Sequence, residues 1–264
     1  NGSEISIVGT GVAYITATQA ETANYVSRAV TSTLKVIQAD STFSVFSLPT
    51  KTFGEGPFDI TVPSSNSEGV FTYTPSSTLV SISGSTITIN GAGDVNIEAM
   101  QEATDNHNES GKVIATLRIA QAIPLFSVFS LPTKTFGDVP FDITLSSSND
   151  VGAFTYTSSN QSVAVINGSE ISIVGAGLAD ITATQAETAN YVSKTVTAPL
   201  YVNKAVPTLT GFSIPTKSYS DDPFTITAPI SNSSGSFTYT SSDSSIATIY
   251  SNTIEIYGIG SVTI

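Results

Sequence analysis

The chain contains no cysteine and only one histidine, His107, among its 264 residues. The absence of cysteine excludes disulfide braces, thiolate metal ligands and cysteine nucleophiles. Charged residues make up only 11% of the chain, and the net charge is −12. This balance argues against nucleic acid or anionic lipid as a partner, since both require clustered Lys and Arg. No apolar run approaches the roughly 18 residues of a membrane span, so we expect no membrane insertion in this segment.

One short pattern, Ile-x-Ile-x-Gly-x-Gly, occurs four times, at residues 5–11, 87–93, 171–177 and 254–260. The starts lie 82, 84 and 83 residues apart, so a unit of about 83 residues is repeated along the chain. Residues 1–27 match residues 167–193 at 24 of 27 positions. A unit of this size is large enough to bury a core of its own. The repeat therefore predicts several small domains in series.

The period divides the chain into four segments, which we call units 1 to 4. Residues 42–124 (unit 2) and 125–207 (unit 3) are complete, residues 1–41 (unit 1) are the C-terminal part of a unit, and residues 208–264 (unit 4) are the N-terminal part. From this phase we expect the full-length protein to continue beyond at least one end. An alternative is that strands of a neighbouring subunit complete the partial unit, as β-strand addition allows.

Within a unit, apolar and polar residues alternate with a period of two. In residues 141–145, Phe, Ile and Leu alternate with Asp and Thr. Such alternation is typical of half-buried strands, and no segment carries a helical period. About seven short strands per unit, beginning with residues 126–131 in unit 3, are separated by turn-rich stretches. This spacing predicts an all-β fold of tandem immunoglobulin-like β-sandwich domains arranged end to end.

Prolines mark the first strand region and the junctions. Pro49, Pro132 and Pro215 occupy equivalent positions, and because proline has no N–H we expect the first strand to be an edge strand or to switch sheets there. The junctions at residues 121–124 and 204–207 are short and end in proline, which biases the preceding residue toward an extended conformation. We therefore expect semi-rigid connections between adjacent domains.

The patterns that could indicate catalysis are incomplete. A phosphate-binding Gly-x-Gly loop requires a third glycine and a following helix, whereas residues 178–181 here begin another strand. His107 stands where the other units have Tyr25 and Tyr191, which argues against an essential base or metal ligand. No Gly-x-Ser-x-Gly elbow accompanies a serine nucleophile. We expect the chain not to be an enzyme.

Acidic residues recur in one loop of each unit. Glu55, Asp138, Asp221 and Asp222 could offer oxygen ligands to Ca²⁺, but the chain has no Asp-x-Asp-x-Asp-Gly pattern. We expect no cofactor and no metal site, and the alternative left open is a calcium contact at the inter-domain loops.

Lysines also recur in phase, at Lys51, Lys134 and Lys217. A lysine–carboxyl isopeptide crosslink would need an acidic partner in each unit. Asp59 and Asp142 fit that role, but unit 4 has Thr225 at the same place. We therefore interpret the lysines as surface residues.

Sequons for N-glycosylation of the Asn-x-Ser form are as frequent as chance predicts and fall in predicted turns. These glycosylation candidates are Asn1, Asn108, Asn160, Asn167 and Asn232.

Residues 181–191 (ITATQAETANY) and 200–208 (LYVNKAVPT), with the Gly-x-Gly before them, resemble bacterial immunoglobulin-like repeats of the MBG kind. Unit 2 departs from the pattern at residues 105–111. The resemblance implies tandem domains of large surface proteins, adhesins, extracellular filaments or viral and phage fibres, and it supplies no catalytic residue. We expect a structural, non-catalytic segment of a long extracellular or virion-surface fibre that associates with itself or with further copies of the repeat. The alternative is an adhesin stalk, or a module that binds a glycan or protein on a cell, phage or virus surface.

Overall fold

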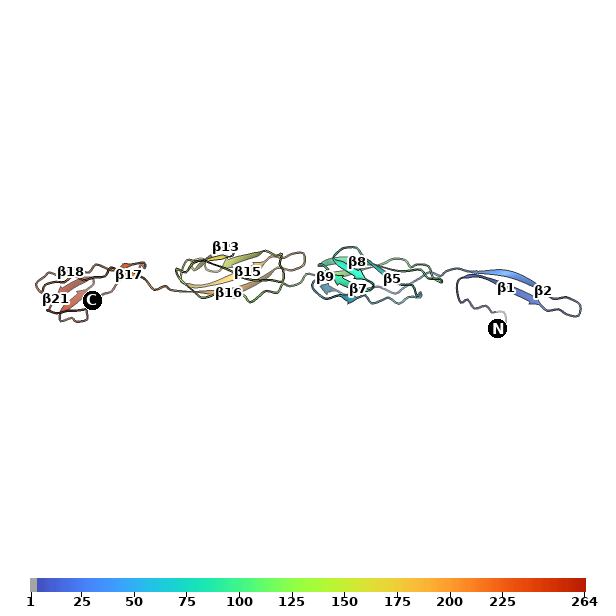
Figure 1. Cartoon of the computed structure of the whole chain (residues 1–264), viewed down its shortest axis with the longest axis horizontal. Coiled ribbons are helices and arrows are strands. Elements are labelled where there is room, and N and C mark those ends of the chain that lie inside the picture. Colours follow the sequence, from blue (N-terminus) through green and yellow to red (C-terminus); the bar gives the residue numbers. More distant parts are fainter. Residues whose placement is uncertain (1–3) are drawn as a thin grey trace.

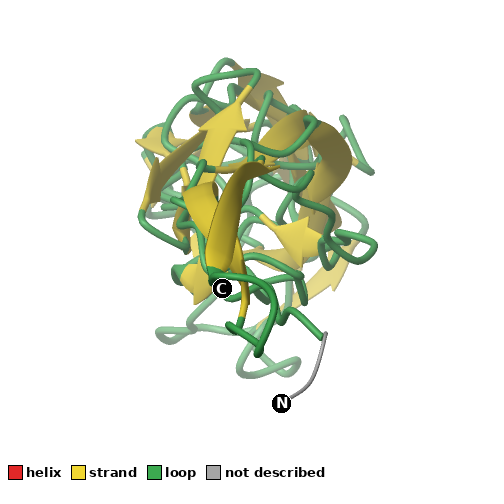
Figure 2. Cartoon of the chain, turned by 90° about the vertical axis from the view of Figure 1, so that its right-hand side faces the viewer, coloured by secondary structure: helices red, strands yellow, loops and turns green. Residues whose placement is uncertain are grey.

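The computed structural model describes residues 4–264, and the secondary structure of this part consists of strands without a helix. The units follow one another along a single long axis, with units 1 and 4 at opposite ends (Figure 1). Viewed from one end, only strands and loops are visible (Figure 2). Residues 4–264 accordingly contain no helix of the length and hydropathy that would cross a membrane. The predicted all-β, end-to-end architecture is confirmed.

Unit 2 is a sandwich of two sheets. One sheet has the strand order β3-β9-β8-β5 and the other has the order β4-β7-β6. The strands are β3 (Lys51–Thr52), β4 (Phe58–Asp59), β5 (Phe71–Pro75), β6 (Val80–Ser83), β7 (Thr86–Ile89), β8 (Gly93–Gln101) and β9 (Val113–Ala120). The longest pairing joins β8 and β9 in an antiparallel hairpin.

Unit 3 repeats this topology, with the sheets β10-β16-β15-β12 and β11-β14-β13. Its strands are β10 (Lys134–Thr135), β11 (Phe141–Asp142), β12 (Phe154–Ser158), β13 (Ala164–Asn167), β14 (Glu170–Ile173), β15 (Gly177–Gln185) and β16 (Lys194–Asn203). The prediction of about seven strands in each immunoglobulin-like unit is confirmed for both complete units.

The core of each complete unit lies between its two sheets. Along β15, Ala179, Ile181 and Ala183 are buried, whereas the residues between them face outward. Leu200 on β16 and Ile171 on β14 meet them from the neighbouring strand and from the opposite sheet, and both are fully buried. Burying one such Leu or Ile side chain contributes about 1.5–3 kcal/mol. The period-two pattern is therefore the main source of stability in each unit.

A glutamine at the end of the long strand is the most deeply buried polar side chain of each complete unit. Gln185 is 1% exposed. Its Nε2 donates hydrogen bonds to the carbonyls of Asn149 (2.6 Å) and Gly152 (2.8 Å), and its Oε1 accepts one from the hydroxyl of Ser147 (2.6 Å). Gln101 is bonded in the same way in unit 2. The fully satisfied amide ties the loop before β12 to the end of β15.

The Gly-x-Gly pattern is a turn between two strands, in agreement with the strand expected from residue 178 onward. Gly93 and Gly177 open the long strands with φ of 138° and 144°, a region that favours glycine. A side chain on the first glycine would collide with its surroundings, because a Cβ on Gly175 would lie 2.3 Å from the carbonyl oxygen of Ser162. Both glycines are therefore required by the backbone of the turn.

The predicted first strand at residues 126–131 is wrong. Phe126 forms only an isolated bridge with Ser147, and the segment up to Pro132 is irregular. Beyond the proline, β10 pairs in parallel with β16. Proline cannot donate to a strand ladder, and β10, which follows Pro132, is an edge strand of its sheet, as predicted.

Units 1 and 4 each contain part of the same fold. Unit 1 is the antiparallel hairpin of β1 (Gly11–Gln19) and β2 (Arg28–Val36), which has the register of β15 and β16. Unit 4 contains the two small sheets β17-β19 and β18-β21-β20. Their strands are β17 (Leu209–Thr210), β18 (Phe224–Thr225), β19 (Ile230–Ser231), β20 (Ala247–Tyr250) and β21 (Thr253–Ile256).

Candidate functional site at the junctions between units

Units 2 and 3 meet through a linker alanine, the Gly-x-Gly turn of unit 2 and the loop between β15 and β16. The N–H of Ala122 donates to the carbonyl of Asn190 (2.9 Å), and the N–H of Val192 donates to the carbonyl of Ala122 (3.0 Å). The side-chain Oδ1 of Asn190 accepts a hydrogen bond from the N–H of Ala92, inside the Gly-x-Gly turn (2.9 Å). One asparagine thus holds both the linker and the end of the preceding unit.

Units 1 and 2 meet through the same contacts. The N–H of Ala39 donates to the carbonyl of Asn106 (2.9 Å), and the N–H of Asn108 donates to the carbonyl of Ala39 (2.8 Å). Oδ1 of Asn106 accepts a hydrogen bond from the N–H of Thr10 in the Gly-x-Gly turn (3.0 Å), whose hydroxyl also donates to the carbonyl of Asp105 (2.7 Å). The two junctions therefore have one geometry.

A linker glutamine adds a fourth shared hydrogen bond. Nε2 of Gln121 donates to the carbonyl of Thr188 (2.7 Å), and Nε2 of Gln38 donates to the carbonyl of Thr104 (2.8 Å). Four hydrogen bonds in different directions around a four-residue linker fix how one unit is tilted and rotated relative to the next. Each of these bonds contributes about 0.5–1.5 kcal/mol net.

The loop that receives these bonds has its own tight turn. The N–H of Thr188 donates to the carbonyl of Tyr191 and the N–H of Thr104 to the carbonyl of His107, both at 2.9 Å. The ring of Tyr191 meets the ring of Phe53 of the preceding unit edge to face, with centroids 5.5 Å apart. His107 occupies the place of Tyr191, so it lies at a junction rather than in a catalytic cluster.

Sequence reasoning missed this asparagine as a functional residue. Its signal was present, since Asn24, Asn106 and Asn190 recur in phase and keep their identity where the tyrosine beside them changes to His107. A polar residue that recurs in an otherwise variable loop indicates that its side chain makes a hydrogen bond with the backbone. Here the backbone N–H that donates this bond belongs to the preceding unit.

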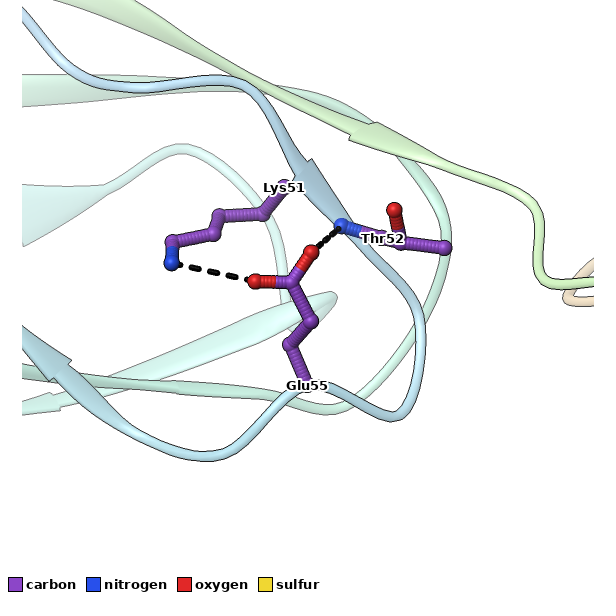
Figure 3. Close-up of polar contacts among 3 residues, drawn as sticks. All are labelled: Lys51, Thr52 and Glu55. Atoms are coloured by element: carbon purple, nitrogen blue, oxygen red, sulfur yellow. Dashed lines mark hydrogen bonds and ion pairs between the residues drawn. The ribbon is translucent and has the colours of Figure 1, made fainter.

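The acidic loop residues cap turns. In unit 2 the Glu55 carboxylate accepts hydrogen bonds from Nζ of Lys51 (3.0 Å) and from the N–H of Thr52 (2.8 Å), as Figure 3 shows. The bond from Lys51, followed by that from the backbone of Thr52, holds the pKa of the Glu55 carboxyl below its ordinary value. Asp138 and Asp221 cap the equivalent turns from the N–H groups of Thr135 and Ser218. Residues 4–264 contain no cluster of three or more His, Asp or Glu side chains suited to a metal ion.

The recurring lysines do not pair with the carboxyls that an isopeptide crosslink would use. Asp59 accepts a hydrogen bond from the hydroxyl of Thr86 (2.6 Å) and Asp142 from that of Ser169 (3.1 Å). Lys51 lies over the ring of Phe58, with Nζ 4.8 Å from its centroid. Lys134 and Lys217 lie over equivalent phenylalanine rings. The lysines therefore make cation–π contacts that cover these rings at the edge of the sandwich.

The sequon asparagines differ in their exposure and in the hydrogen bonds that their side chains make. Asn1 lies outside the described residues. Asn108 donates to the Asp40 carboxylate, Asn160 accepts from Ser162, and Asn232 accepts from the N–H of Thr208. Asn167 is exposed at the end of β13. Asn108, Asn167 and Asn232 are exposed and Asn160 is half-buried, and glycosylation stays a prediction.

No family model and no curated protein matches the chain. Comparison with solved structures gives matches of low identity and low TM-score. Drosophila N-cadherin EC1-4 is 11% identical with a TM-score of 0.31, over 96% of this chain and 76% of that one. Sidekick-1 immunoglobulin domains 1-5 are 12% identical with a TM-score of 0.24, over 88% and 57%. A SusE-like surface located polysaccharide binding protein of Bacteroides thetaiotaomicron is 16% identical with a TM-score of 0.27, over 72% and 37%. The chain's own sheets identify it as a tandem array of immunoglobulin-like β-sandwich units.

Proposed function

We propose that this chain is a structural, non-catalytic segment of a long fibre on a cell or virion surface, built from bacterial immunoglobulin-like units of the MBG kind. The observation that supports this proposal most is the repeated junction. Two linkers of different sequence hold their neighbours through the same four hydrogen bonds, so the angle between units is set by the repeat itself.

A fixed angle repeated along a chain gives a stiff rod. Flexible tethers between domains consist of Gly- and Ser-rich segments that make no contacts. Here the linkers are short, Ala39 and Ala122 are bonded on both their N–H and C=O groups, and Pro124 is fully buried. The carbonyl of Pro124 also accepts a hydrogen bond from Lys194 of the following unit (2.7 Å). Such a stiff array extends over a long distance and transmits force, as a stalk or filament must.

Electron microscopy of the purified chain tests this proposal. Particles in which units 1, 2 and 3 lie in line are the expected result. Particles that bend by variable angles at the junctions of units 1 and 2 or of units 2 and 3, where the four bonds lie, would contradict it. Replacing residues 121–124 by a Gly-Ser linker of equal length provides the control, because it removes the bonded alanine and glutamine and should convert straight particles into bent ones.

A further inference from the structure

We propose that Asn167 is a site of spontaneous covalent modification, at which the side-chain amide is lost as ammonia and aspartate or isoaspartate remains. The site lies at the tip of the β13–β14 hairpin, on the smaller sheet of unit 3, where Figure 1 labels β13. The inference goes beyond the proposed function and is independent of it, because it concerns the chemistry of one turn and not the contacts between units.

The reaction needs an asparagine followed by a residue whose backbone nitrogen can approach it. Asparagine is among the thermally labile residues, and glycine hinders the approach least because it has no Cβ. The backbone nitrogen of Gly168 attacks Cγ of Asn167, so that a C–N bond forms and a succinimide ring closes. The bond between Cγ and Nδ2 breaks, and the side-chain nitrogen leaves as ammonia with the proton of the Gly168 amide. Water then opens the ring at either carbonyl and gives aspartate, or isoaspartate with a main chain that is one methylene longer.

The fold leaves Asn167 open to this reaction. Asn167 and Gly168 are both exposed, at the point where β13 ends and the turn to β14 begins. A Cβ built on Gly168 would meet nothing within 4 Å, so no neighbour blocks the approach of its nitrogen. Among residues 4–264, no backbone carbonyl accepts a hydrogen bond from the Gly168 N–H. The attacking nitrogen is therefore accessible in the folded chain.

A second Asn-Gly pair, Asn90-Gly91 in unit 2, is protected by its surroundings. The N–H of Gly91 donates to the carbonyl of Leu79 (3.1 Å), and Nδ2 of Asn90 donates to the carbonyl of Thr78 (3.2 Å). Gly91 is buried, and a Cβ on it would lie 2.6 Å from the Leu79 side chain. Ring closure at Asn90 first requires both hydrogen bonds to break, because they hold the attacking nitrogen and the leaving amide. We therefore expect the reaction to be about tenfold or more faster at Asn167.

Among the described hairpins of this kind, the one in unit 3 alone combines the turn with an asparagine. The equivalent pairs are Ser83-Gly84 in unit 2 and Tyr250-Ser251 in unit 4. Gly84, Gly168 and Ser251 have φ of 60°, 63° and 58°, so the backbone of the turn is alike in the three units. The serine of unit 2 identifies a side chain that this turn accepts and that cannot react.

Modification weakens the edge of the smaller sheet of unit 3. Asn167 lies directly opposite Glu170, so a new carboxylate places two negative charges across the hairpin. The isoaspartyl form also lengthens the chain beside Ser169. The carbonyl of Ser169 accepts a hydrogen bond from the N–H of Ile143 (2.8 Å), and its hydroxyl donates to the carboxylate of Asp142 (3.1 Å). These bonds hold the end of β11 against the hairpin.

Prolonged incubation of the purified chain at mildly alkaline pH tests the site. Each conversion adds one negative charge to the net charge of −12, so ion exchange separates the products. Peptide mass spectrometry locates the change, and electron-transfer fragmentation distinguishes isoaspartate from aspartate. Both products are expected at Asn167, with conversion about tenfold or more slower at Asn90. Asn1, which is also followed by glycine and lies outside the described residues, is scored separately.

Two controls separate the effect of the fold from that of the local sequence. In urea, where the chain is unfolded, Asn167 and Asn90 should convert at similar rates. Asn167→Ser, which copies Ser83 of unit 2, should abolish the conversion in the β13–β14 hairpin and leave that at Asn90 unchanged. Equal rates at the two sites in the folded chain, or a difference that persists in urea, would overturn the inference. Aspartate without isoaspartate at Asn167 would overturn the succinimide route.

The effect on the sheet is measured by hydrogen exchange of the β13 and β14 amides in the separated forms. The modified chain should exchange these amides faster than the unmodified chain, whereas the amides of unit 2 should be unaffected. Equal exchange in the two forms would overturn the predicted weakening of the sheet edge.

Discussion

The side-chain oxygen of Asn190 accepts a hydrogen bond from the backbone N–H of Ala92, a residue 98 positions earlier and in the preceding unit. The same relationship joins Asn106 to Thr10, 96 positions earlier. Most side-chain bonds of this chain stay within one unit. These two bonds, together with the alanine and glutamine bonds of the linkers, set the geometry between units.

Replacing Gln101 by leucine should destabilise unit 2. The substitution keeps the side-chain volume but leaves the Ser65 hydroxyl and two carbonyls without their partner, which costs about 1–3 kcal/mol. Hydrogen exchange of the β8 amides measures the stability of this unit alone. Gln19→Leu is the matched control and should change little, because this equivalent glutamine at the end of β1 is exposed. Equal losses in both variants would contradict the proposed role of the buried amide.

Tyr73→Phe should leave unit 2 as stable or make it more stable by about 1 kcal/mol. The Tyr73 hydroxyl is buried without a hydrogen-bond partner, and its burial raises the pKa of the phenol. Removing an unsatisfied polar atom removes its desolvation cost. Hydrogen exchange of the unit 2 amides at increasing temperature compares the stability of the natural chain with that of the variant. A clear loss of stability in the variant would mean that the hydroxyl has a partner in solution.

Gly175→Ala should destabilise unit 3 by about 1–3 kcal/mol, because the new methyl group would collide with the carbonyl of Ser162 and the backbone of the turn would have to move. Gly56→Ala is the control. A Cβ at that position meets nothing within 4 Å, so the substitution should be neutral or mildly stabilising through the unfolded chain. Urea denaturation of both variants distinguishes a packing effect from a general effect of lost glycine.

Acid should weaken the turn that Glu55 closes. The pKa of Glu55 is lowered in the folded chain, first by its bond with Lys51, so its contribution to stability is present above the unfolded-state pKa and is lost as the pH falls through the folded-state pKa. The difference in stability between the natural chain and Glu55→Gln should therefore shrink between pH 7 and about pH 3. A difference that stays constant over this range would show that the carboxylate charge is not involved.

The fold could be predicted from the sequence because its period-two alternation and its glycine pairs are each compatible with one local structure. Residues 177–185 can bury Ala179, Ile181 and Ala183 only as a strand, and the turn before them needs glycine. The first strand was predicted wrongly at residues 126–131, where a β-like composition ends at Pro132 and the neighbouring hydroxyls and loops offer competing bonds.

The junction was harder to predict for a different reason. A loop asparagine such as Asn190 bonds to a backbone N–H whose position depends on how two folded units meet, and single-unit periodicity carries no information on that. Phe53 and Tyr191 likewise show their relationship only once the units are in line. The in-phase recurrence of the asparagine was the one usable signal.

The most direct test of the account is the distance distribution between spin labels on either side of one junction. Arg118→Cys and Thr195→Cys place labels on exposed strand positions of units 2 and 3, in a chain without other cysteines. A single narrow distribution is expected, and it should broaden markedly with Asn190→Ala but not with Asn24→Ala. A broad distribution in the unaltered background, or one that ignores Asn190→Ala, would contradict the claim that this asparagine fixes consecutive units into a stiff rod.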